Sequence, residues 1–112
     1  MIDWDRVNEL RSEIGIDDFD EVVTLFLEEA DEAIARVSVL AGAKPLEADL
    51  HSLKGAALNL GFSEFAALCQ EGERRAAAGS TDVDLDQVRA VYQASKRTFE
   101  TTLAQGPEAR CA

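Results

Sequence analysis

One short segment, residues 50–61, brings together residue types that suit phosphoryl chemistry. It holds the only histidine of the 112-residue chain, His51, followed by Lys54 and Gly55. Residues three and four apart are neighbours on a helix surface, so Lys54 and Gly55 would both flank the imidazole. Glycine destabilises a helix interior by about 1 kcal/mol relative to alanine, and here it would leave room for a large group beside the ring. A solvent-exposed imidazole is largely unprotonated and nucleophilic near neutral pH. The segment therefore predicts a nucleophile for an anionic partner, with phosphate as the leading candidate.

The rest of the segment predicts the helix that must position His51. At about 100° per residue, its apolar side chains fall on one narrow stripe that should face a core, and His51 points away from that stripe towards water. Gly61 is placed to end the helix. The expected core-facing residues are Leu46, Leu50, Leu53, Ala57 and Leu60.

The pattern His51-x-x-Lys54-Gly55, flanked by leucines and followed by Gly61, resembles the signature of histidine-containing phosphotransfer (HPt) domains. The resemblance extends over nearly the whole chain, from about residue 5 to about residue 104. It implies a protein that relays a phosphoryl group between the aspartates of receiver domains in a two-component phosphorelay. By this resemblance, His51 is the phosphoacceptor through Nε2, Lys54 neutralises phosphate charge, and Gly55 gives steric clearance.

The same resemblance limits what the chain itself must supply. In this family the acceptor aspartate and a magnesium ion belong to the receiver, so we expect no cofactor and no metal site here. The chain has no glycine-rich phosphate loop and no nucleotide-binding signature. We therefore expect a phosphoryl carrier rather than a kinase, with response-regulator receiver domains, a hybrid histidine kinase, or both as partners.

A second observation concerns the outward face of the same helix. Leu58 lies two turns beyond His51, at a position where an amphipathic helix usually carries a polar residue. An apolar contact beside the histidine suits docking of a protein partner. The expected docking patch comprises Leu58, Ala48, Phe62, Ile14 and Ile16.

Three polar residues are candidates for support of the site. Ser52 and Asn59 lie to one side of the His51 face. Glu73 takes the position on the following helix where some members of the family carry an amide that supports the phosphorylated ring. A carboxylate cannot donate a hydrogen bond to phosphate and would repel it. The neighbouring Gly72 also departs from the apolar residue expected there, which indicates looser packing or a closer backbone approach.

Composition excludes several other classes of protein. The net charge of −11, from 22 acidic and 11 basic residues, argues against nucleic acid or an anionic membrane as partner. No apolar run approaches the roughly 20 residues needed to cross a bilayer, and the acidic N-terminus does not resemble a signal peptide. Cys69 and Cys111 do not form a disulfide framework. We expect a cytoplasmic monomer, free-standing because the chain starts with Met1.

Hydrophobic periodicity predicts five helices and no strand. They run from a cap at Asp3 or Asp5 to about Ile14, from a cap at Asp17 or Asp18 to about Leu40, from Pro45 to about Leu60, from a cap at Ser63 to before Gly79, and from a cap at Asp82 or Asp84 to about Leu103. The expected fold is all-α, an antiparallel up-down four-helix bundle with a short extra N-terminal helix packed as a lid. Residues 1–105 should form this domain, and residues 106–112 a disordered tail.

One alternative function remains open, and a second is disfavoured. The first is a helical adaptor that docks receiver domains without carrying phosphate, which should tolerate His51→Gln where a carrier should not. The second is a dimeric histidine kinase core, whose histidine is usually followed by acidic and basic residues and then proline. This sequence lacks that pattern, and we expect no ATP-binding domain, so this class is disfavoured, although a dimer in solution would reopen the question.

Overall fold

The computed structural model describes residues 2–105, and within them the chain is helical apart from short connections. The elements are α1 (Trp4–Ile14), α2 (Ile16–Arg36), the short 3-10 helix η1 (Val39–Ala41), α3 (Ala43–Leu60), α4 (Ser63–Ala77) and α5 (Leu85–Gln105). Residues 2–105 form no β-strand, and only an isolated bridge pairs Ile2 with Phe62. The all-α prediction is confirmed, whereas the predicted tail, 106–112, lies outside the described residues.

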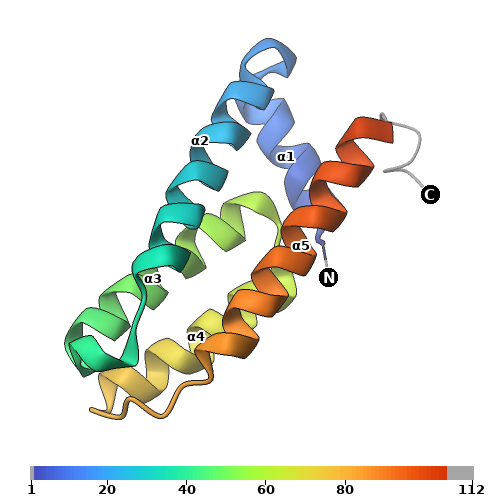
Figure 1. Cartoon of the computed structure of the whole chain (residues 1–112). Coiled ribbons are helices and arrows are strands. Elements are labelled where there is room, and N and C mark those ends of the chain that lie inside the picture. Colours follow the sequence, from blue (N-terminus) through green and yellow to red (C-terminus); the bar gives the residue numbers. More distant parts are fainter. Residues whose placement is uncertain (1, 106–112) are drawn as a thin grey trace.

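Two long helices, α2 and α5, form the sides of the molecule, and consecutive helices run in opposite directions (Figure 1). The hairpin of α3 and α4 occupies one half of the length between them, and α1 lies beside α2 and α5 in the other half (Figure 1). The α3–α4 contact is the most extensive between any two helices. None of the helices within residues 2–105 combines the length and the apolar character that crossing a membrane requires.

Two glycines position α3 against its neighbouring helices. Gly61 ends α3 in the left-handed conformation, with φ of 74°, and its carbonyl accepts a 2.6 Å hydrogen bond from Asp3 N at the start of α1. A Cβ on Gly72 in α4 would lie 2.8 Å from Leu50 Cδ1 and 3.2 Å from Val83 Cγ1. Gly72 therefore marks a close approach of α4 to α3, one of the two possibilities that the sequence left open.

A polar network joins α2 to α5. The buried Tyr92 donates its hydroxyl hydrogen to Asp31 Oδ1 at 2.5 Å, and Lys96 Nζ lies 2.8 Å from Asp31 Oδ2. One turn further along, Arg89 Nη2 donates a 2.7 Å hydrogen bond to the carbonyl of Val37, at the end of α2. These contacts hold together two helices that are far apart in the sequence.

Asp3 and Asp84 cap α1 and α5, as predicted, through their side-chain oxygens. Other predicted boundaries were wrong. No side chain caps α2, because Gly15 takes a φ of 96° and lets α2 begin at Ile16, directly after α1. Val37 is extended and ends α2 at Arg36, so Leu40 lies 94% exposed in η1 instead of in the core.

The starts of α3 and α4 also differ from the prediction. Pro45 is the third residue of α3, where its missing N–H costs no hydrogen bond because the first-turn donors have no partner inside the helix. Phe62, not Ser63, occupies the cap position of α4, and Ser63 is its first residue.

Candidate functional site

His51 projects from the outer side of α3, as the helical pattern predicts. Its side chain is 69% exposed, while the adjacent Leu50 and the following Leu53 are fully buried. Because each residue turns the helix by about 100°, burial of these leucines in the core leaves the imidazole on the surface.

Glu73 on α4 joins the two chemically important residues of α3. Its Oε2 lies 2.6 Å from His51 Nδ1, and its Oε1 lies 2.6 Å from Lys54 Nζ. The Glu73 side chain is only 18% exposed, so its carboxylate is partly desolvated. Each of its two oxygens contacts one of these partners. The site is therefore a group of three residues on two helices.

The charges at the site favour an ionised Glu73. The hydrogen bond from Lys54, assisted by that from His51, lowers the pKa of the Glu73 carboxyl despite its partial burial. Burial and the negative charge of Glu73 raise the pKa of the nearby Cys69 thiol to about 12, although Lys54 opposes this rise. At neutral pH Glu73 is thus a carboxylate, and Cys69 stays a protonated thiol and is no nucleophile.

This geometry selects one tautomer of the imidazole. An ionised carboxylate has no hydrogen to donate, so His51 Nδ1 must carry the proton of the 2.6 Å contact. The lone pair of a neutral ring then lies on Nε2, the nitrogen turned away from Glu73. A histidine whose second nitrogen is fixed in this way has a defined ring orientation and a defined tautomer.

Gly55 is not required by packing within the chain. A Cβ at this exposed position would meet no atom within 4 Å. Its absence of a side chain is consistent with clearance for an incoming partner, and it leaves the surface one turn from His51 open.

The other two candidate supporting residues, Ser52 and Asn59, make no hydrogen bond to the imidazole among the contacts of the described residues. Ser52 is exposed on α3 next to His51. Asn59 Oδ1 accepts a 3.2 Å hydrogen bond from Arg6 Nη2 on α1. This hydrogen bond links α1 to α3 and does not involve the imidazole.

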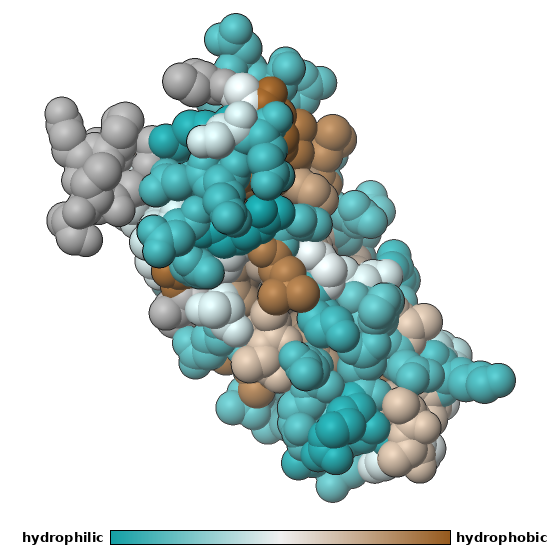
Figure 2. All heavy atoms as spheres, turned by 180° about the vertical axis from the view of Figure 1, so that it is seen from behind, coloured by the Kyte–Doolittle hydropathy of each residue, from teal (hydrophilic) through white to brown (hydrophobic). Residues whose placement is uncertain are grey.

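The predicted docking patch is only partly present on the surface. Leu58 is 56% exposed and Ala48 is exposed, whereas Ile14 is half-buried and packs against the core. The side chain of Ile16 lies outside the part of the chain that the structure describes. On the face seen in Figure 2, hydrophilic residues dominate and the hydrophobic atoms form small separate areas.

Phe62 was wrongly assigned to that patch. Its side chain is fully buried and packs edge-on against Phe99, with ring centroids 5.4 Å apart, and against Tyr92 at 6.4 Å. The left-handed turn at Gly61 changes the direction of the chain after α3. The helical periodicity of α3 therefore does not extend to residue 62, and it wrongly predicted that the Phe62 side chain is exposed beside His51.

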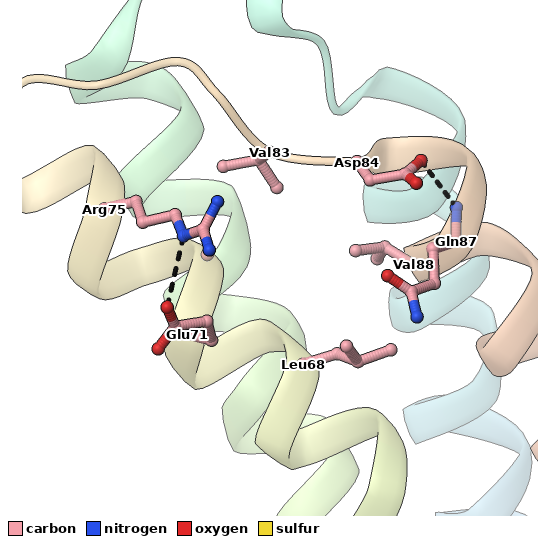
Figure 3. A pocket seen from close by; sticks show the side chains of 8 residues that line it. Leu68, Glu71, Arg75, Val83, Asp84, Gln87 and Val88 are labelled. Atoms are coloured by element: carbon pink, nitrogen blue, oxygen red, sulfur yellow. Dashed lines mark hydrogen bonds and ion pairs between the residues drawn. The ribbon is translucent and has the colours of Figure 1, made fainter.

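A shallow pocket lies between α4, the 79–84 connection and α5 (Figure 3). Three of its polar side chains have partners in the protein: Arg75 Nε lies 3.1 Å from Glu71 Oε1, and Asp84 accepts a hydrogen bond from the backbone N–H of Gln87 as the cap of α5. The pocket includes none of the residues predicted for the site. Among residues 2–105, no group of three His, Cys, Asp or Glu side chains is placed to hold a metal ion.

Sequence reasoning missed the contact of Glu73 with the imidazole. The sequence named Glu73 as a possible support of the site, but the expected effect of its carboxylate was repulsion of phosphate, not a hydrogen bond to Nδ1. The available signal was a glutamate on the next helix facing a histidine and a lysine three residues apart, because a carboxylate has two oxygens to offer two donors.

The comparisons agree with the geometry. The family model described as Hpt domain matches residues 21–104, more than half of the chain. No curated protein and no solved structure gave a match. This chain belongs to the Hpt domain family, whose members are helical-bundle phosphocarriers of two-component signalling rather than kinases.

Proposed function

We propose that this protein carries a phosphoryl group on His51 between aspartates of response-regulator receiver domains. The observation that carries the proposal is the 2.6 Å contact between His51 Nδ1 and Glu73 Oε2 on a ring that is otherwise exposed. It leaves Nε2 as the nucleophilic nitrogen and directs it at the surface, where a partner domain can reach it.

The transfer follows from this arrangement. The Nε2 lone pair attacks the phosphorus of a receiver phospho-aspartate, an N–P bond forms, and the P–O bond to the aspartyl oxygen breaks with its electrons going to that carboxylate. Lys54, 24% exposed at the site, lies on the same side of α3 and can donate to the phosphoryl oxygens. Catalysis of this kind is chiefly positioning and charge neutralisation, and the magnesium ion would belong to the receiver.

Docking is proposed to use Leu58 and Ala48, which are exposed on α3 on either side of His51. We also propose that α2, α3, α4 and α5 correspond to the antiparallel four-helix bundle of the family, with α1 as the extra helix. The alternating helix directions (Figure 1) support this assignment. A monomer acting on cytoplasmic receiver domains is part of the same proposal.

The test is transfer from a phosphorylated receiver domain to this protein, followed by electrophoresis that separates phosphorylated forms. Phosphoryl should move to the wild type and not to His51→Gln, which keeps a similar size and polarity. If His51→Gln accepts phosphoryl, or if the wild type binds phosphorylated receivers without ever accepting it, the carrier proposal is wrong.

A further inference from the structure

Gly55 and Asn59 are neighbours on the surface of α3, one helical turn apart. Gly55 is exposed, and the space that a Cβ would occupy there is open. Side chains of a helix lean towards its N-terminus, so the side chain of Asn59 leans back towards Gly55. His51 lies one turn before Gly55. The open surface at Gly55 is therefore bordered by the imidazole on one side and by an amide on the other.

Arg6 on α1 fixes the orientation of the Asn59 amide. An arginine side chain has only hydrogen-bond donors, so the amide atom that lies 3.2 Å from Arg6 Nη2 must be the oxygen Oδ1. The guanidinium is also held from its own helix, since Nη1 lies 3.2 Å from Glu9 Oε2 and 3.6 Å from Glu13 Oε1. Arg6 therefore determines which side of the amide carries the hydrogens.

The amide nitrogen of Asn59 is a donor that the protein does not use. Nδ2 carries two hydrogens, and neither has a hydrogen-bond acceptor among residues 2–105. Asn59 is only partly exposed. A partner that covers α3 would remove the remaining water from Nδ2, and the partner itself would then have to supply an acceptor.

The position of Nδ2 indicates the kind of acceptor. Asn59 lies eight residues beyond His51, about 12 Å along the helix axis, so Nδ2 does not reach a phosphoryl group on the imidazole. A carboxylate of the partner is disfavoured, because Glu9 and Glu13 beside Arg6 are largely exposed and would repel it. A neutral main-chain carbonyl fits best, since the missing side chain at Gly55 lets another main chain approach closely.

We propose that the open surface at Gly55 receives a main-chain segment of the docked receiver domain, and that Asn59 donates a hydrogen bond from Nδ2 to a carbonyl oxygen of that segment. Arg6 is a positioning residue that keeps Nδ2 available to the partner. The inference rests on the proposed function, which makes the receiver domain the partner. It gives α1 a part in recognition, although α1 carries none of the reacting groups.

The experiment compares two phosphoryl donors: a phosphorylated receiver domain, which must dock, and phosphoramidate, which is too small to need the open surface. Uptake is followed by intact mass, and the ratio of the two initial rates is measured with the receiver below saturation. Asn59→Asp keeps an oxygen for Arg6 but replaces both amide hydrogens with a second oxygen. Its ratio should fall about tenfold, because the facing carbonyl loses its donor. An Asn59→Asp protein with the wild-type ratio would overturn the inference.

Asn8→Asp is the matched control for the added negative charge, since Asn8 is exposed on α1. Its ratio should equal that of the wild type. An equal fall in both variants would show that charge, and not the lost donor, slows docking, and would also overturn the inference. A wild type that takes up phosphoryl from neither donor would instead reject the proposed function, and this inference with it.

A double substitution tests whether Arg6 acts through Asn59. Arg6→Met removes the donor to Oδ1 while keeping much of the apolar stem, and it should lower the ratio severalfold. In an Asn59→Ala background the same substitution should have no further effect, because the amide that Arg6 positions is gone. A fall of equal size in both backgrounds would contradict the positioning role of Arg6.

Discussion

Gly72 and Leu50 pack so closely that a Cβ on Gly72 would lie 2.8 Å from Leu50 Cδ1. These residues directly precede Glu73 and His51, so the close approach of the helices is next to the contact that defines the site. Both Gly72 and Leu50 are buried. The packing of the core and the geometry of the imidazole are therefore linked through one residue on each helix.

We expect Gly72→Val to destabilise the fold and to loosen the site. The added side chain must displace Leu50 or Val83, and overpacking of this kind costs about 1–3 kcal/mol. The free energy of unfolding from urea titration should fall accordingly, and the His51 ring resonances should move towards those of a free histidine. Gly55→Ala is the control: with open space around its Cβ, it should stabilise α3 by about 0.5–1 kcal/mol. Gly72→Val with undiminished stability would argue against the close packing.

Leu58→Glu should weaken docking of a receiver. Leu58 is 56% exposed two turns beyond His51, and a charge in an apolar contact is desolvated without a partner. We expect transfer from a receiver to slow at least about tenfold, which corresponds to roughly 1.4 kcal/mol of lost binding. Leu40→Glu is the matched control, because Leu40 is even more exposed but lies in η1, before α3 begins. Equal effects of the two substitutions would count against a patch at Leu58.

Ser95→Ala should stabilise the protein. Ser95 is fully buried in α5, and its hydroxyl oxygen has no hydrogen-bond partner among the described residues. An unsatisfied buried polar group costs about 1–3 kcal/mol, and alanine also has the higher helix propensity. Ser12→Ala, at an exposed position of α1, measures the propensity gain alone. The gain in unfolding free energy for Ser95→Ala should exceed that of Ser12→Ala, and a smaller gain would mean that the hydroxyl is satisfied.

Asp31 should contribute to stability in a pH-dependent way. Burial alone would raise the pKa of its carboxyl, but the hydrogen bonds from Lys96 and Tyr92 together outweigh burial and lower the pKa below the ordinary 3.8. Because the folded pKa is below the unfolded one, the contribution is complete above the unfolded pKa and is lost as pH falls through the folded one. The difference in urea midpoint between the wild type and Asp31→Asn should therefore be constant near neutral pH and shrink below about pH 4. A difference that grows on acidification would refute this linkage.

The helices and the exposure of His51 could be predicted because both follow from one periodicity. Leu50 and Leu53 define the buried face of α3, and the direction of His51 follows from their positions alone. The boundaries of α2 were harder to predict. Gly15 and Val37 set them through their backbone conformations, which cannot be read from the spacing of apolar residues. The pattern therefore extended α2 as far as Leu40, beyond its true end.

Contacts between helices were the other feature that the sequence alone did not predict. The pairing of Glu73 with His51 depends on the register of α4 against α3, which is set by Gly61, Gly72 and the turn between the helices. Burial of Phe62 has the same origin, because it follows that turn and points at α5. One sequence gives the faces of each helix but not the register in which two faces meet.

The central claim, that His51 is the phosphoacceptor, is tested most directly by intact mass after incubation with phosphoramidate, beside a His51→Ala control. The wild type should gain a single phosphoryl group that is lost in acid, and His51→Ala should gain none. A helical wild type that gains no phosphoryl group, or an adduct that persists in His51→Ala, would contradict the account.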